Sequence, residues 1–175
     1  MDKTFPVVLE LDVPKHPRDI FSFTKAAMQQ VMDCRDLDLA TQRKIKMILI
    51  ELVTNSIKHS GHSDSQIRLV IDEPSLTIQK KEKGVQIEFM SSEQQIPFEE
   101  IDKTIKISFS TENNHHVKTL DRYKFRFLDP FKEGLNIEHM PEHFGFYIIT
   151  LASDSFVYQY DPEKKENHYI VNINT

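Results

Sequence analysis

The sequence has few glycines and almost no cysteine: four glycines and one cysteine in 175 residues. Phosphate-binding loops depend on several glycines, which let the backbone approach a ligand closely. The scarcity of glycine therefore argues against a glycine-rich phosphate loop. A lone cysteine, Cys34, excludes an internal disulfide framework and suits a reducing cytoplasm. We interpret Cys34 as an inert, partly buried thiol.

Long apolar runs and clusters of one charge are also missing. No apolar run approaches the roughly 20 residues that a membrane span needs. Residues 1–13 contain one lysine and alternate like a strand, unlike a signal peptide. Lys plus Arg total 22 and Asp plus Glu total 27, a net charge of −5 without a basic cluster, so nothing supports nucleic-acid binding. We expect a single cytoplasmic domain, residues 1–175, with no membrane or nucleic-acid partner.

Hydrophobic periodicity predicts both helices and strands. Residues 6–13 alternate as a strand, and apolar residues recur at helical spacing from Pro17 to Met32. A second helix is expected from a cap at Asp38 to about Ser60. The other expected elements are strands at 65–72, 75–82 and 84–91, a short helix at 97–105, a helix at 145–153, and a hairpin formed by 155–160 and 168–173. This pattern predicts an α/β (α+β) two-layer sandwich, with a mixed, mainly antiparallel sheet and helices on one face.

The stretch "ILIELVTNSIKHSGHSD" places polar groups in an apolar helix. Glu51 and Asn55 are four residues apart on one helical face, with Lys58 and His59 one turn further on. Burying a carboxylate and an amide without partners costs several kcal/mol. Either the pair lines a cleft, or the two side chains bond neighbouring backbone or each other through water. Lys58 and His59 contact a ligand or, alternatively, only neutralise the helix end.

The segment "ELVTNSIKH" and the order of elements resemble the histidine-kinase-like ATPases, the group of gyrases, chaperones, kinases and mismatch-repair proteins. The resemblance is strongest to the anti-sigma-factor serine kinases. It implies the fold of that family, magnesium binding by Asn55, activation of water or a substrate hydroxyl by Glu51, and a position near phosphate for Lys58. The ending "HFGFYIITLASDSFVYQY" resembles the family's last glycine motif, with Gly145 as its second glycine and Asp154 as its acidic residue.

Two glycine motifs of that family are altered in this sequence. In "SSEQQIP", Ser91 stands where the family has an adenine-reading aspartate, and Glu93 and Gln95 replace two glycines. His143 replaces the first glycine of the last motif. A serine bonds an amine without charge assistance, at a loss on the order of 1–2 kcal/mol. By the resemblance, Ser91, Glu93, Gln95, His143 and Gly145 border the cofactor, and we expect Mg-ATP binding to be weakened or lost.

Residues 107–142 are expected to form a divergent, lid-like segment that fills the old nucleotide cleft, because long connections inside a domain are often lids or binding segments. The histidines offer zinc-like spacings, such as His139 and His143, but Pro141 interrupts that pair, so surface or lid histidines are the preferred reading.

The resemblance implies a signalling regulator that binds a sigma factor or a small antagonist protein, with homodimerisation plausible. The alternative is an active Mg-ATP-dependent serine kinase or ATPase that uses Glu51 and Asn55. A third reading is the detached catalytic domain of a histidine kinase, which needs a partner domain with a phospho-accepting histidine.

Overall fold

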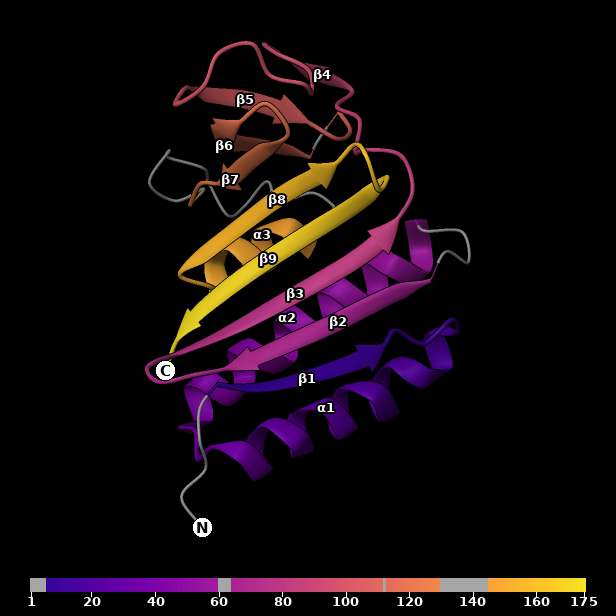
Figure 1. The fold of residues 1–175 in the computed structure, drawn as a ribbon, viewed down its shortest axis with the longest axis vertical. Coiled ribbons are helices and arrows are strands. Elements are labelled where there is room, and N and C mark those ends of the chain that lie inside the picture. The colour runs from indigo at the N-terminus through magenta and orange to yellow at the C-terminus, as the bar shows by residue number, and fades with distance from the viewer. Residues whose placement is uncertain (1–5, 60–63, 112, 130–144) are drawn as a thin grey trace.

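The chain forms one nine-stranded antiparallel sheet with three α-helices in the residues that the computed structural model describes, 6–59, 64–111, 113–129 and 145–175. The strand order is β1-β2-β3-β9-β8-β7-β6-β5-β4 (Figure 1). The strands are β1 (Val7–Asp12), β2 (Ser65–Ile71), β3 (Ser75–Lys83), β4 (Ser91–Ser92), β5 (Thr104–Ser108), β6 (Asn114–Asp121), β7 (Lys124–Phe127), β8 (Ser155–Asp161) and β9 (Glu166–Asn174). The helices are α1 (Ile20–Cys34), which follows a 3-10 turn (Pro17–Asp19), α2 (Leu39–His59) and α3 (Gly145–Ala152).

The expected sandwich, with a mixed sheet and the histidine-kinase-like ATPase fold, was wrong. Every pair of neighbouring strands is antiparallel. The three helices lie behind β1–β3, β8 and β9, whereas no described helix covers β4–β7, which extend the sheet beyond them (Figure 1). The protein is therefore an α+β fold made mostly of sheet. Hydrophobic periodicity locates strands but does not report how they pair, so it could not establish the arrangement of the sheet.

Several predicted elements are confirmed by the structure. The strand at 6–13 is β1, the helix from Pro17 is the 3-10 turn with α1, and the helix at 145–153 is α3. The final hairpin is β8–β9. Asp38 caps α2, because the Thr41 backbone N–H donates to Asp38 Oδ1 at 2.9 Å and the Thr41 hydroxyl donates to Oδ2 at 2.7 Å.

The strand expected at 84–91 was wrong except at its end. Residues 86–89 form no strand, and only Ser91 and Ser92 pair with β5. The Ile87 backbone N–H donates instead to the Tyr158 hydroxyl at 3.0 Å, and the Asn167 side-chain amide donates to the Val85 carbonyl at 3.0 Å. Side chains of β8 and β9 thus satisfy the backbone that strand pairing would otherwise satisfy.

The helix expected at 97–105 was also wrong. The Phe98 N–H donates to the Arg122 carbonyl at 2.8 Å and the Asp102 N–H to the Thr119 carbonyl at 2.9 Å. These long-range bonds replace the bonds between residues four apart that define a helix. The last residues of the expected helix begin β5 instead.

Much of the expected lid is regular sheet. Within 107–142, the end of β5, all of β6 and all of β7 are strands, and residues 130–142 lie outside the described part of the chain. The inward face of β6 carries His115 and Thr119 as well as Val117. Because two of these three buried side chains are polar, the alternation of hydrophobic and polar residues that marks a strand is weak in this segment.

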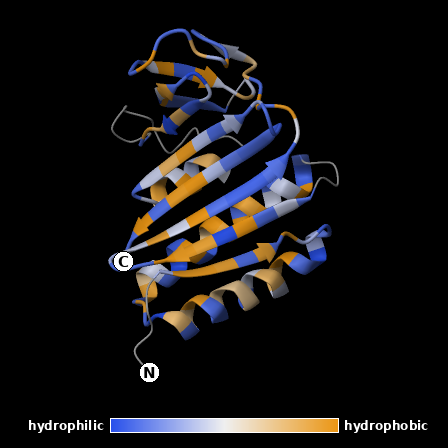
Figure 2. Cartoon of the chain, viewed as in Figure 1, coloured by the Kyte–Doolittle hydropathy of each residue, from blue (hydrophilic) through white to orange (hydrophobic). Residues whose placement is uncertain are grey.

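The core lies between the sheet and the helices. Apolar side chains of α2 that are less than 2% exposed, such as Ile45, Leu49 and Leu52, pack with buried residues of the sheet such as Leu69 and Val171. Apolar positions follow the helices and central strands in Figure 2. A second group of aromatic rings fills the β5–β7 end, where Phe125 lies 5.8 Å from Phe89 and 6.0 Å from Phe98 between ring centroids. Both groups of side chains belong to one hydrophobic core that extends along the sheet.

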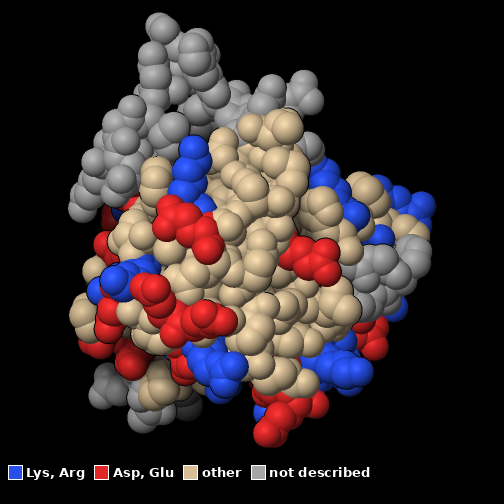
Figure 3. Space-filling model, turned by 90° about the horizontal axis from the view of Figure 1, so that it is seen from above, with Lys and Arg blue, Asp and Glu red and all other residues tan. Residues whose placement is uncertain are grey.

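The surface seen from the β4–β5 end carries charges of both signs. Lysines, arginines and carboxylates are interspersed around a largely uncharged middle on the described residues of this face (Figure 3). This face therefore shows no continuous surface of one sign. Among the helices of the described residues, none combines the length and the apolar character that crossing a bilayer requires.

Candidate functional site

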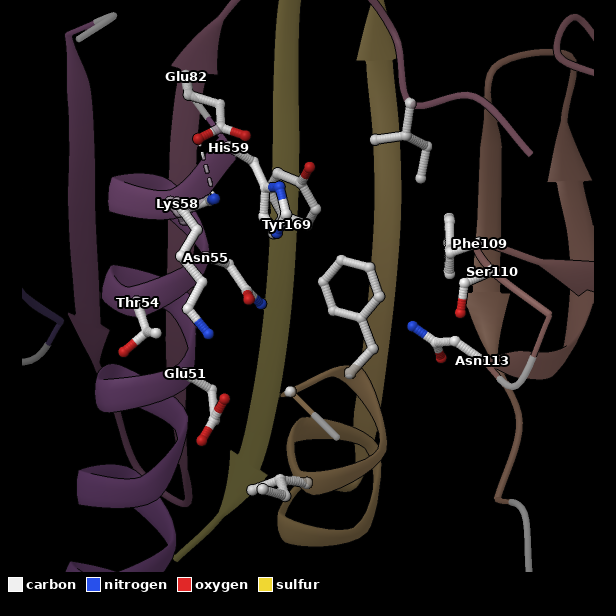
Figure 4. Close-up of a pocket in the computed structure, with 15 residues that line it drawn as sticks. Glu51, Thr54, Asn55, Lys58, His59, Glu82, Phe109, Ser110, Asn113 and Tyr169 are labelled. Carbon is white, nitrogen blue, oxygen red and sulfur yellow. Dashed lines mark hydrogen bonds and ion pairs between the residues drawn. The ribbon is translucent and has the colours of Figure 1, made fainter. Parts of the chain in front are cut away.

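A cavity of about 630 Å³ opens between α2, the start of α3 and the sheet (Figure 4). Its volume is in the range of small-molecule sites. Its lining residues are Glu51, Thr54, Asn55, Lys58 and His59 of α2, Lys80 and Glu82 of β3, Tyr169 of β9, Gly145, Phe146 and Ile148 of α3, and Ile87, Phe109, Ser110 and Asn113 of connecting loops.

The motif pair of α2 points into this cavity. Glu51 and Asn55 are one helical turn apart, so both side chains leave the same face of α2, as Figure 4 shows. Burial raises the pKa of the Glu51 carboxyl, and the positive charge of Lys58 opposes that rise. The carboxylate and amide oxygens are the donors that Mg²⁺ prefers, and Lys58 adds a cation beside them. This wall is therefore suited to a metal-bound anion.

Gly145 allows α3 to begin directly against that pair. A Cβ atom built on Gly145 would lie 3.0 Å from Glu51 Oε2 and 3.0 Å from Asn55 Nδ2. A contact of 3.0 Å is tighter than most Cβ contacts in proteins, so a larger residue would require the Glu51 and Asn55 side chains or α3 to shift by a few tenths of an ångström. The glycine identified from the sequence thus fits closely against Glu51 and Asn55, and all three residues line the same wall of the cavity.

A buried ion pair forms the sheet side of the cavity. Lys80 Nζ lies 2.9 Å from Glu82 Oε2 and 4.2 Å from the centroid of the Tyr169 ring. The Ser56 hydroxyl also donates to Glu82 Oε2, at 3.0 Å. Burial lowers the pKa of Lys80, and Glu82 opposes that change. The two charges compensate each other at the base of the cavity.

The sequence analysis did not identify Lys80 and Glu82 as site residues, although the hydrophobic alternation of β3 indicated that Lys80 is buried. In β3, Leu76, Ile78 and Lys80 alternate, and all three are buried. Period-two alternation therefore places Lys80 on the core face, where a lysine is rarely found unless it is paired. An inward lysine in a strand was the observable clue.

The opposite wall of the cavity is aromatic. The rings of Phe109 and Phe146 lie 5.4 Å apart between centroids, and Phe146 lies 6.0 Å from Tyr169. Ser110 and Asn113 carry the polar groups of this wall (Figure 4). A ligand with a charged end toward α2 and a flat or apolar end toward these rings would match the cavity.

The remaining predicted site residues do not meet this cavity in the described structure. Ser91 pairs with Ser108 at the β4 edge of the sheet. Glu93 and Gln95 are exposed in the loop after β4, and neither lines the cavity. His143 lies outside the described residues. Four of the predicted residues, Glu51, Asn55, Lys58 and Gly145, are therefore brought together, and three are not.

Only some of the histidines considered as zinc ligands lie in the described residues. His59 lines the cavity, whereas His115 is buried among aromatic rings, 4.1 Å from Tyr147 between centroids. The described residues contain no group of three or more His, Cys, Asp or Glu side chains arranged to hold a metal. Cys34 is half-buried at the end of α1. Any metal at this site would thus need oxygen atoms of a ligand in addition to Glu51 and Asn55.

No protein-family model matches this chain, and no curated protein matches it significantly in sequence. The cavity and the chemistry of its lining therefore carry the functional argument.

Proposed function

We propose that this protein is a signalling regulator, similar in function to the anti-sigma-factor serine kinases, that binds a partner protein and keeps only a weakened magnesium-nucleotide site. One observation carries the proposal. Glu51, Asn55, Lys58 and Gly145 line one cavity, while Ser91, the position matching the adenine-reading residue, lies at the far edge of the sheet. The residues matched to phosphate and magnesium binding thus lie together, and the residue matched to base recognition lies apart from them.

The charges of the cavity favour the phosphates over the base. Lys58 brings a cation and Asn55 brings a metal-binding oxygen, whereas Glu82 compensates the charge of Lys80. Base selectivity of several kcal/mol needs buried hydrogen-bonding groups aimed at the base edge. The aromatic wall supplies stacking instead, which tolerates any base. The nucleotide contribution thus comes from the triphosphate and stacking, and different bases should bind about equally.

Titration with magnesium nucleotides tests this proposal. We expect Mg-ATP and Mg-GTP to bind in the millimolar range with affinities within about fivefold of each other, a spread of about 1 kcal/mol. Magnesium tripolyphosphate, which lacks a stacking base, should bind more weakly by about fivefold or more. Asn55→Ala should abolish binding of all three, whereas Ser91→Ala, at the matched but distant position, should change nothing. Strong preference for ATP that Ser91→Ala removes would contradict the proposal. No binding of any of the three would remove its nucleotide part.

The partner is proposed to be a sigma factor or a small antagonist protein with a phosphorylatable serine. Cross-linking in the native cytoplasm, followed by mass spectrometry of the complexes, tests this directly. Recovery of such a protein in stoichiometric amount is expected. Recovery of neither class, with and without added Mg-ATP, would contradict this part of the proposal.

A second candidate function is phosphotransfer to a serine. The half-buried Glu51 carboxyl favours it, because burial moves the pKa of Glu51 toward the range of a general base. In this reading Asn55 would hold magnesium and Glu51 would accept the proton of the attacking serine hydroxyl. The serine oxygen would bond the terminal phosphorus of the nucleotide as the bond from that phosphorus to the nucleoside diphosphate breaks. Glu51→Gln should then abolish phosphate transfer and leave Mg-ATP binding in place. Absence of transfer to any serine-bearing partner recovered from the cytoplasm would exclude the candidate.

A further inference from the structure

A second hollow lies between α1 and α2, and it shares no lining residue with the first cavity. It is a groove of about 640 Å³, and α1 and α2 pack side by side along it. We call it the α1–α2 groove. Its lining residues are Pro17, Ile20, Phe21, Thr24, Lys25, Met28, Gln29 and Met32 from the first helical segment, and Leu39, Gln42, Arg43, Lys46 and Ile50 from α2.

Large apolar side chains in the groove are exposed to solvent. Phe21 is 72% exposed, Leu39 60% and Met32 37%. Exposed apolar side chains that line one groove are typical of interaction sites, because covering them removes apolar surface from water. Methionine side chains adapt their shape to a partner. The groove therefore has the composition of an unpartnered binding surface.

The polar residues of the groove carry charge of one sign. Lys25, Arg43 and Lys46 are exposed and line it, and no acidic residue does so. Within residues 6–59, 64–111, 113–129 and 145–175, none of these three cations takes part in an ion pair. The chain as a whole has a net charge of −5, so this groove is locally opposite in sign. An acidic partner is the complement of such a surface.

The length of the groove matches a short helix. Its α2 wall runs from Leu39 to Ile50, or about 16 Å at about 1.5 Å per residue. An amphipathic helix of about three turns would place three or four apolar side chains along this length. We propose that the α1–α2 groove binds an acidic amphipathic helix of a partner protein, its apolar face on Phe21, Met32 and Leu39 and its carboxylates beside Lys25, Arg43 and Lys46.

Two other occupants fit the groove less well. A second copy of this chain that docked the same face would bring the three cations against their own copies, and like charges in an interface are repulsive. A lipid surface takes a flat or convex basic face, whereas this one is concave between two helices. A separate acidic helix satisfies both the shape and the charge.

This inference rests on the proposed function only in that the partner is a protein, and its test does not involve the nucleotide cavity. The probe is a fluorescent peptide of about 14 residues, designed as an amphipathic helix with leucines at i, i+3, i+4 and i+7 and glutamates beside them. Fluorescence anisotropy with the full chain should show saturable binding that weakens by about tenfold or more between about 50 and 300 mM salt. A peptide of the same composition in scrambled order should bind at least about tenfold more weakly.

Variants locate the site. Arg43→Glu with Lys46→Glu should weaken peptide binding by at least about tenfold, because two attractions become repulsions. Lys44→Glu reverses one charge, half the change of the double variant, on an exposed position of α2 outside the groove, and should change the affinity by less than about threefold. Phe21→Ala should also weaken binding. None of these variants should alter Mg-nucleotide binding. A failure of the groove proposal can therefore be told apart from a failure of the proposed function.

Three results would overturn the proposal. One is absence of saturable peptide binding at millimolar concentration, and another is equal binding of the scrambled peptide. The third is loss of self-association, or of binding to anionic vesicles, in the Arg43 and Lys46 variants without any change in peptide affinity. That last result would assign the groove to a second copy or to a lipid surface.

Discussion

The ammonium group of Lys80 lies 2.9 Å from the carboxylate of Glu82, and the two side chains are only 2% and 11% exposed. Such a pair repays its desolvation only while both charges are present. The Tyr169 ring and the Ser56 hydroxyl add contacts to Lys80 and Glu82 respectively. The pair is therefore a place where removing one partner costs much more than removing both.

Glu82→Gln leaves the Lys80 charge buried and uncompensated. We expect a loss of about 3–5 kcal/mol in the free energy of unfolding, and a much smaller loss in the double variant Lys80→Met, Glu82→Met. Urea unfolding at neutral pH measures both. Arg68→Met is the matched control, because both side chains of the ion pair between Arg68 and Glu10 are more than half exposed, so the pair should be worth less than about 1 kcal/mol. A strictly additive double variant would contradict the prediction.

His115 should make the protein less stable in mild acid. It is 4% exposed, and burial, with a smaller contribution from His116, lowers the pKa of His115 to about 3. In the unfolded chain the pKa is about 6.5, so between these values the unfolded state binds the extra proton and the folded state does not. Stability contributed by neutral His115 is therefore complete above about pH 6.5 and falls steadily toward pH 3.

The expected loss from His115 between pH 7.5 and pH 5 is about 2 kcal/mol, from about 1.36 kcal/mol per pKa unit. Urea unfolding at the two pH values measures it. His115→Phe removes the titrating group and should flatten this difference, although it also leaves the Asn113 oxygen without its bond to the His115 ring, which is 2.7 Å long. His16→Gln, at an exposed position, should leave the difference as it is in the wild type. An unchanged pH dependence in His115→Phe would refute the prediction.

Gly145→Ala should crowd the side chains of Glu51 and Asn55. The new methyl group would stand 3.0 Å from both Glu51 Oε2 and Asn55 Nδ2, so these side chains or α3 must shift by a few tenths of an ångström. We expect a destabilisation of about 1–3 kcal/mol, partly offset by the better helix propensity of alanine. Thermal and urea unfolding measure the change.

A double variant that combines Gly145→Ala with Asn55→Ala is the control. Shortening Asn55 to alanine removes one of the two close neighbours, so the double variant should lose less than the sum of the single variants. A coupling free energy of zero would show that α3 does not depend on this contact.

Tyr158→Phe should loosen the loop at residues 84–89. The Tyr158 hydroxyl accepts the Ile87 N–H at 3.0 Å and donates to Asn167 Oδ1 at 2.6 Å. Removing it leaves a part-buried backbone N–H without its partner, at a cost of about 1–3 kcal/mol. Hydrogen exchange should show the Ile87 amide losing protection. Tyr160→Phe is the neighbouring control in the same strand, and faster exchange at Ile87 in both variants would contradict the assignment.

The site was predictable where its residues are close in the sequence. Glu51 and Asn55 are one helical turn apart, so their common direction followed from the spacing alone. Gly145 was recognised from its place before an apolar helix, but its distance of 3.0 Å from the motif pair is a tertiary fact. Ser91, Glu93 and Gln95 were assigned by analogy with a fold that the sheet contradicts, and the described cavity does not contain them.

The individual helices and the last hairpin were predictable from the sequence, because helix caps and hydrophobic periodicity depend on residues a few positions apart. The Asp38 cap, the course of α1, α2 and α3, and the β8–β9 hairpin were fixed in this way. Only the tertiary structure decided that residues 104–127 extend the sheet, because the backbone bonds of Phe98 and Asp102 go to partners about 20 residues away. It also decided that a lysine of β3 lies under the cavity, since burial depends on all the elements that surround a strand and not on the strand alone.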